Sequence, residues 1–129
     1  MVKKISALLI AFLGSVLLLF GCGDPYKNFS LSVSKSDVIL YLSDEEGLVN
    51  SEDLTATISG AAKGISTDVT FSQYGANGVN DIVTIENVSK NGNTTNFTLK
   101  ANKVGRGVIH VNSLEGTKRA EINVTVYIP

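Results

Sequence analysis

Apolar and polar residues alternate along this chain from residue 29 to its end, and this period of two constrains the fold more than any other feature. The last run is the clearest, because Ile122, Val124, Val126 and Ile128 alternate with more polar neighbours. Successive side chains of a strand point to opposite faces, so such a run has one apolar face and one face for water. No window of helical length shows an i, i+3, i+4, i+7 stripe. The pattern predicts an all-β protein with Val124 in the core and Asn123 outside.

Eight segments carry the strand pattern. They are residues 29–33, 38–42, 54–58, 69–71, 82–85, 97–101, 107–111 and 122–128. Turn-forming residues separate them, and Asn91-Gly92 is the strongest hairpin signal because both residues tolerate the positive φ of a type I′ turn. Seven or eight short strands in a domain of this size predict two packed sheets.

A different pattern occupies the N-terminus. Lys3 and Lys4 precede residues 5–21, of which 13 of 17 are apolar. A positive start followed by a short apolar run is typical of a signal peptide. We therefore predict a cleaved signal peptide at residues 1–21. The alternative is an uncleaved signal anchor, and either arrangement places the rest of the chain outside the cytoplasm.

Residues 19–22, Leu-Phe-Gly-Cys, follow this run directly. They resemble the bacterial lipobox, which has a Leu three places before a Cys and a small residue just ahead of it. The resemblance implies cleavage before Cys22 and lipidation of its thiol, with two or three acyl chains, palmitate among them. Each buried CH₂ contributes about 0.8 kcal/mol to membrane binding, so such an anchor would be durable. Residues 22–28 are expected to tether the anchor to a domain at residues 29–129.

Composition excludes several classes of protein. One Cys and one His rule out a disulfide framework and a four-ligand zinc site within the chain. Without Lys3 and Lys4, 9 of the 11 basic residues remain against 12 acidic ones, and the net charge of −3 argues against nucleic acid as a partner. Because no paired-carboxylate motif, G-x-S-x-G or phosphate loop is present, we expect neither catalysis nor a cofactor.

Several pieces follow one another in a recognisable order: residues 54–58 (LTATI), 69–72 (VTFS), 81–85 (DIVTI), 99–101 (LKA), 104–109 (VGRGVI) and 120–126 (AEINVTV). In this order residues 29–129 resemble a bacterial immunoglobulin-like domain of group 2, the module of invasin- and intimin-like surface proteins. Phe71 stands where that family usually has Trp. The resemblance implies an immunoglobulin-like Greek-key sandwich of seven to eight strands. It also implies adhesion, spacing at the cell surface, or contact with a protein or glycan.

Residues 73–81 form the candidate ligand-contact loop. Tyr74, Asn77 and Asn80 are its expected contact residues. Loops at the ends of β-sandwiches commonly bind ligands, and an exposed Tyr offers a large contact area at a small entropic cost. The alternative is a mobile connection whose Tyr74 folds back onto the sheet.

Three further features have weaker functional interpretations. His110 lies between Ile109 and Val111, so it is expected to point outward as a solvated strand residue. A group of acidic residues has enough oxygens for Ca²⁺ but lacks the Asp-x-Asp-x-Asp-Gly spacing, and a solvated loop is the alternative; the group is Asp44, Glu45, Glu46, Glu52 and Asp53. Five basic residues are expected to form a modest patch that favours solubility: Lys100, Lys103, Arg106, Lys118 and Arg119.

These features predict a lipid-anchored protein of the bacterial cell envelope whose domain lies outside the cytoplasm. Its expected role is that of a non-catalytic binding, adhesion or spacer module. Its expected partners are a membrane, reached through the lipid, and a protein or glycan ligand. The alternative is a periplasm-facing accessory subunit of an envelope complex, in which strand edges pair with a partner.

Overall fold

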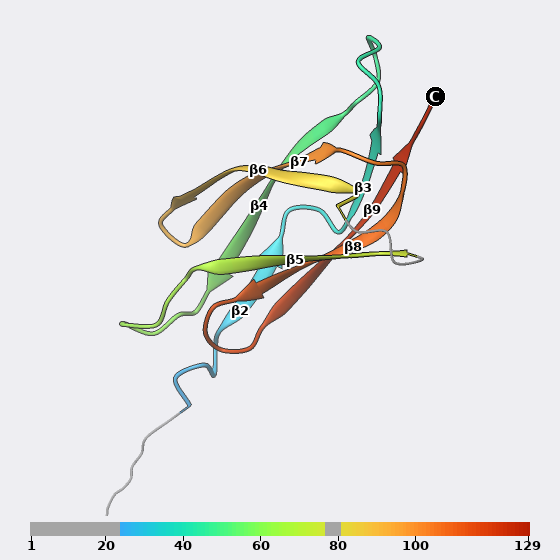
Figure 1. Cartoon of the computed structure of the whole chain (residues 1–129). Helices are drawn as coiled ribbons and strands as arrows, with labels where there is room; N and C mark the ends of the chain where they lie inside the picture. The colour runs from blue at the N-terminus through green and yellow to red at the C-terminus, as the bar shows by residue number, and fades with distance from the viewer. Residues whose placement is uncertain (1–23, 77–80) are drawn as a thin grey trace, which may run out of the picture.

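The chain folds into two four-stranded β-sheets packed face to face (Figure 1). The computed structural model describes residues 24–76 and 81–129. The strands are β2 (Ser30–Val33), β3 (Asp37–Tyr41), β4 (Ser51–Ser59), β5 (Val69–Gly75), β6 (Val83–Asn91), β7 (Thr94–Ala101), β8 (Gly105–Ser113) and β9 (Arg119–Tyr127). Among the described residues, no helix has the length and apolar character needed to span a bilayer. The predicted signal peptide and Cys22 lie outside the described residues.

The strand order is β2-β4-β7-β6 in one sheet and β3-β9-β8-β5 in the other. All pairs are antiparallel except β3 and β9, which run parallel with Val38 opposite Val124. The first strand region is therefore divided between the sheets, since β2 pairs with β4 while β3 pairs with β9. Two sheets ordered ABED and CFG define the immunoglobulin sandwich, and this chain has that order with its first strand split. The predicted all-β Greek-key fold is confirmed.

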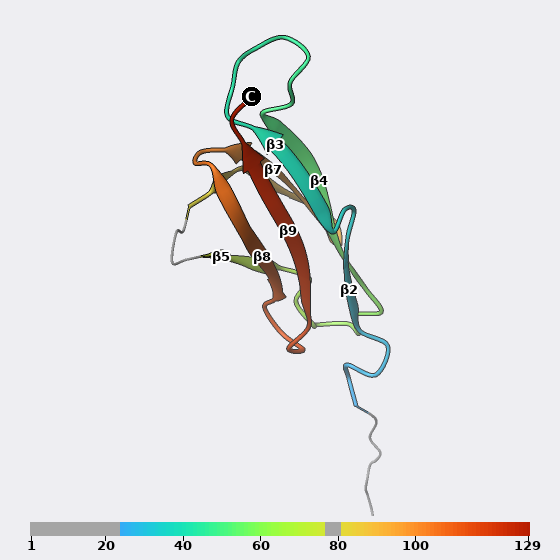
Figure 2. The ribbon, with the colours of Figure 1, turned by 90° about the vertical axis from the view of Figure 1, so that its right-hand side faces the viewer.

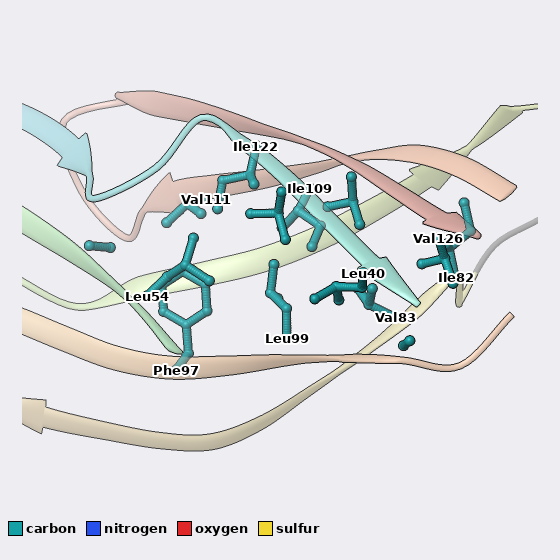
Figure 3. Close-up of a cluster of buried hydrophobic side chains, with 14 residues drawn as sticks. Leu40, Leu54, Ile82, Val83, Phe97, Leu99, Ile109, Val111, Ile122 and Val126 are labelled. Atoms are coloured by element: carbon teal, nitrogen blue, oxygen red, sulfur yellow. The ribbon is translucent and has the colours of Figure 1, made fainter. Parts of the chain in front are cut away.

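The alternating residues of both sheets fill the space between them (Figure 3). Val124 is 2% exposed and Asn123 is exposed, as the alternation predicts. Phe97 on β7 reaches across to Phe71 on β5, with ring centroids 4.8 Å apart. Burying a large apolar side chain stabilises a fold by about 1.5–3 kcal/mol, so the alternation supplies most of the driving force. The other large, fully buried side chains are Leu40, Leu54, Ile58, Ile82, Val83, Leu99, Ile109, Val111, Ile122 and Val126.

All eight predicted strands are present, but most of them extend beyond the predicted bounds, β5 and β6 the furthest. β5 continues to Gly75 and β6 to Asn91, through residues that lack an apolar alternation. Both are edge strands, so their pairing needs only one neighbour and much of their surface faces water. The expectation for Ile128 was wrong: the pairing of β9 with β3 ends at Tyr127, and Ile128 is 66% exposed.

The predicted hairpin joins β6 and β7, but its turn lies one residue later than Asn91-Gly92. Asn91 pairs with Thr94, so Gly92 and Asn93 are the two turn residues. Only Gly92 of these two has a positive φ, at 65°. Glycine at the first central position is typical of a type II′ turn, whose twist also suits a hairpin.

The two ends of the sandwich are distinct (Figures 1 and 2). We call the end at which the described chain begins the basal end; it comprises residues 24–28, the β4–β5 connection at 60–68 and the β8–β9 turn at 114–118. The opposite, apical end comprises the β3–β4 connection at 42–50, the β7–β8 connection at 102–104 and the C-terminal residues. The described chain thus enters the sandwich at one end and leaves it at the other.

Residues 24–28 were expected to be part of a tether, but they fold against the basal end. Tyr26 packs edge-to-face on Phe29, with ring centroids 5.6 Å apart, and its hydroxyl donates a hydrogen bond to Glu115 Oε1 at 3.3 Å. The backbone of this segment closes two turns, from Lys27 N to Asp24 O and from Phe29 N to Tyr26 O. Asp24 is therefore held close to the domain.

Candidate functional site

The outer face of the β3-β9-β8-β5 sheet carries an open groove of about 490 Å³. The strand register explains its lining, because Tyr74, Val108 and Asn123 lie in one row across β5, β8 and β9. Arg106 and Thr125 form the next row toward the apical end. These side chains point outward because their neighbours in β8 and β9 fill the core. The volume is in the range of small-ligand pockets, about 300–1,000 Å³.

Tyr74 is the aromatic wall of this groove. We had expected Tyr74 in a loop, but it lies within β5. Its side chain is 55% exposed on the face of the sheet. Its ring lies 4.8 Å from the His110 ring, with 50° between the two planes. The other two predicted contact residues, Asn77 and Asn80, lie outside the described residues. Of the three predicted contact residues, only Tyr74 is among the described residues, and it lies on the surface of a sheet and not in a loop.

Arg106 is the cationic wall. Its side chain is exposed, and within residues 24–76 and 81–129 its guanidinium has neither an ion pair nor a side-chain hydrogen bond. Asn123 is partly engaged, since its amide donates to Asp37 Oδ1 at 3.4 Å. The groove therefore offers an aromatic ring, an unpaired cation and polar side chains on an apolar floor. Sequence reasoning did not associate Arg106 with Tyr74, because only the register of β5 and β8 brings them together.

His110 points outward as predicted, but the expectation that it is simply solvated was wrong. Its side chain is only 17% exposed, because it is covered by Tyr74 on one side and approached by Glu121 on the other. The Nε2 atom lies 3.5 Å from Glu121 Oε2. The Nδ1 atom is buried without a hydrogen-bond partner in the described structure. His110 thus supports the Tyr74 ring from beneath, and among the described residues no second His or Cys lies near it for chemistry.

The acidic residues of the 44–53 segment do not converge. Glu52 forms an ion pair with Lys35, Asp53 accepts a hydrogen bond from Thr98 at 2.6 Å, and Asp44 accepts one from Asn50 at 3.2 Å. Across the described ranges, no three His, Cys, Asp or Glu side chains gather into a group suited to a metal ion. The segment is a set of separate surface contacts.

The five basic residues predicted to form one patch are divided between the two ends. Lys100, Lys103 and Arg106 lie toward the apical end, whereas Lys118 and Arg119 lie in and beside the basal β8–β9 turn. Residues close in sequence separate here because β8 runs the full length of the sandwich between them. The expectation of a single patch was therefore wrong.

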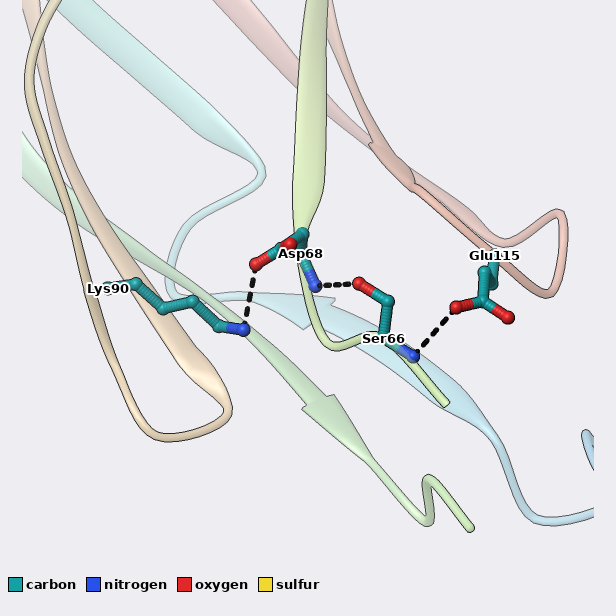
Figure 4. Close-up of polar contacts among 4 residues, drawn as sticks. All are labelled: Ser66, Asp68, Lys90 and Glu115. Atoms are coloured by element: carbon teal, nitrogen blue, oxygen red, sulfur yellow. Dashed lines mark hydrogen bonds and ion pairs between the residues drawn. The ribbon is translucent and has the colours of Figure 1, made fainter. Parts of the chain in front are cut away.

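A polar cluster closes the basal end (Figure 4). Glu115 accepts a hydrogen bond from the Ser66 backbone N–H at 2.9 Å, and the Ser66 hydroxyl accepts one from Asp68 N at 3.1 Å. Asp68 pairs with Lys90 at 2.8 Å, and this bond and charge lower the pKa of the Asp68 carboxyl. Partial burial, and then the nearby Glu115 carboxylate, raises the pKa of Tyr26. The cluster joins the β4–β5 connection to three other parts of the chain.

Comparison with known proteins supports the fold but does not assign the chain to a family. No protein-family model matches the chain, and no curated protein matches it. Domains 4 and 5 of the S-layer protein SbsC are similar over 76% of this chain, with 16% identity and a TM-score of 0.50. This chain covers 51% of that structure, so it spans about half of its length.

Two other solved structures have lower TM-scores. The Yersinia pseudotuberculosis adhesin InvE is similar over 77% of this chain and 26% of its own, with 23% identity and a TM-score of 0.44. The PKD domain of human KIAA0319 is similar over 84% of this chain and 92% of its own, with 17% identity and a TM-score of 0.40. At these identities the resemblance concerns the fold alone, which is an immunoglobulin-like sandwich.

Proposed function

We propose that this protein is an exported binding or spacer module, held on a membrane of the bacterial cell envelope by lipid attached to Cys22. The observation that carries the proposal is the Leu19-Phe20-Gly21-Cys22 sequence at the end of a short, positively preceded apolar segment. The domain that follows supports the proposal, because the described chain enters the sandwich at the basal end and leaves it at the apical end. Such an arrangement suits a module that stands on a surface. The adhesive or spacing role rests on that fold and on the groove.

Replacement of the anchoring residue tests the first half of the proposal. Cys22→Ser, or treatment of cells with globomycin, should leave unprocessed precursor and abolish the palmitate label on the protein. Ser15→Ala, within the apolar segment, is the matched control and should be processed normally. Normal processing of the Cys22→Ser variant would contradict lipid anchoring.

Binding through the groove tests the second half. The chain should be probed against immobilised glycans and extracellular matrix proteins, and any binding should be compared among variants. Tyr74→Ala and Arg106→Ala remove the two walls of the groove and should weaken binding at least tenfold. Thr84→Ala, on the other sheet and exposed, is the control. Equal binding by all three variants would exclude the groove as the contact surface.

A role as an accessory subunit is the second candidate, favoured by the longer edge strand of each sheet, β6 and β5. In the described structure each of them has one neighbouring strand, although the backbone N–H and C=O of Val83 in β6 are already bound by the Gln73 side chain. An unpaired edge is a template for a strand of a partner protein. Protease treatment of intact cells separates the two roles, because it should remove a surface adhesin and spare a periplasm-facing subunit.

A further inference from the structure

The basal end carries an excess of positive charge. Lys27, Lys63 and Lys118 are all exposed there, and within the described part of the chain none of the three forms an ion pair. Arg119 adds a fourth exposed cation, with its Nε donating to Asn112 at 2.9 Å. These cations lie on three segments that are separate in sequence, so only the fold brings them to one surface.

The acidic groups of the same end are largely occupied by neighbours. Glu115 accepts hydrogen bonds from Tyr26 and Ser66, and Asp68 is paired with Lys90. Asp24 is the remaining carboxylate, and its Oδ1 accepts a bond from Tyr26 N at 2.9 Å. The apical end differs, because its longest connection presents the exposed carboxylates Asp44, Glu45 and Glu46.

An exposed apolar side chain accompanies the cations. Leu114 is 59% exposed at the start of the β8–β9 turn. Its backbone N–H donates to Asp68 O at 2.9 Å, and Ser113 N donates to Lys118 O at 2.9 Å, so the turn is fixed in place. Apolar side chains rimmed by Lys and Arg are typical of surfaces that lie at the boundary between lipid headgroups and acyl chains.

The lipid attachment proposed above would bring this end to a membrane. Consecutive Cα atoms are about 3.8 Å apart, so Cys22 Cα lies within about 8 Å of Asp24 Cα. Asp24 is itself held against the domain through Tyr26. Surface potentials decay over a Debye length of about 8 Å at physiological ionic strength, so the basal cations would stand within their range.

We propose that the basal end docks on anionic lipid headgroups, with the cations over the phosphates and Leu114 at the headgroup boundary. This inference rests on the proposed lipid anchor, which supplies the proximity, and adds an orientation that the anchor alone does not impose. The sandwich then stands upright, because the basal cations have few free carboxylates beside them, whereas the apical end mixes the carboxylates Asp44, Glu45 and Glu46 with the cations Lys100, Lys103 and Arg106. The groove between Tyr74 and Arg106 lies toward the apical half and stays open to a ligand.

A single tryptophan reports the docking directly, since the chain has no Trp of its own. The full chain carrying Leu114→Trp is processed in cells, purified and reconstituted into vesicles of phosphatidylcholine alone or with an equal part of phosphatidylglycerol. On the anionic vesicles its emission should shift to the blue and be quenched by brominated acyl chains. Both signals should be lost in 1 M salt, where the Debye length is about 3 Å. Val49→Trp, 51% exposed at the apical end, is the matched control and should show neither signal.

Charge removal identifies the residues responsible. Each Lys near an anionic surface contributes about 1 kcal/mol, or about fivefold in the docking equilibrium, so Lys63→Gln with Lys118→Gln should shift it about 25-fold. Lys100→Gln with Lys103→Gln removes the same charge near the apical end and should have no effect on the Leu114→Trp signal. Equal effects of the two pairs would overturn the assignment to the basal end.

The same vesicles separate failure of docking from failure of the anchor. Protein retained on both lipid compositions, but without a Leu114→Trp signal on the anionic one, refutes docking and leaves the anchor intact. Protein that binds and gives the signal only with phosphatidylglycerol supports docking and refutes the anchor. Protein retained by neither composition refutes both.

Discussion

The two ends of the sandwich are held together in different ways. At the basal end, side chains from distant segments interlock: Tyr26 packs on Phe29, and Glu115 binds both Tyr26 and Ser66. At the apical end, the connections are tied by backbone hydrogen bonds, such as Leu42 N to Tyr127 O and Ala101 N to Asn50 O. Side-chain contacts depend on the identity of each residue, whereas backbone bonds do not. The basal end should therefore be sensitive to substitution and the apical end tolerant.

A matched pair of glycines gives the largest expected difference. Gly60 and Gly47 both have positive φ, at 72° and 90°. A Cβ on Gly60 would lie 1.9 Å from the Asn28 carbonyl oxygen, whereas one on Gly47 would meet nothing within 4 Å. Gly60→Ala should cost about 2–5 kcal/mol, from backbone strain and overpacking together, and Gly47→Ala about 1 kcal/mol from strain alone. Urea denaturation measures both free energies of unfolding, and equal losses would contradict the close approach at the basal end.

Removal of a carboxylate from each end gives a smaller difference. Glu115→Ala leaves the Ser66 N–H without its acceptor and should cost about 1–2 kcal/mol. Asp44→Ala removes only an exposed bond from Asn50 and should change stability by less than about 0.5 kcal/mol. Thermal unfolding followed by circular dichroism compares the two. A larger loss for Asp44→Ala would reverse the contrast between the ends.

The smallest expected effect is a dependence on pH at the basal end. Because Lys90 lowers the pKa of Asp68 in the folded chain, the pair stabilises the fold above the ordinary carboxyl pKa of 3.8. This contribution should disappear as the pH falls through the lower, folded-state pKa. Melting temperatures between pH 5 and pH 2 should therefore fall less steeply for Asp68→Asn than for the natural chain. Lys90→Gln should reproduce that profile. If the melting temperature of either variant fell with pH as steeply as that of the natural chain, the pair would not contribute to stability.

The number of strands and the faces that they bury could be predicted because burial of alternating side chains dominates the stability of a sandwich. Leu54, Phe97 and Ile122 are each 2% exposed or less, at positions that the period of two assigns to the core. The prediction failed where pairing continues without burial, as in the second half of β6. It also failed at Ile128, which has the pattern of a core residue but lies beyond the last strand pair.

The groove could not be predicted because its walls belong to different strands. Tyr74 lies 32 positions before Arg106 in the numbering, and only the antiparallel register of β5 with β8 places them together. The same register places Tyr74 beside His110, which explains why a residue expected to be solvated is mostly covered. The sequence correctly indicated that Tyr74, an aromatic residue in a polar segment, is exposed at the surface. The expectation that it lies in a loop was wrong.

The sequence by itself determined that the chain forms a β-sandwich, because a period of two separates an apolar from a polar face within each strand and needs no knowledge of the neighbours. Only the tertiary structure decided which outward residues meet, which cations share the basal end and which carboxylates are already occupied there. Those relations depend on strand register and on the approach of loops, and both are settled by the packing of the whole chain.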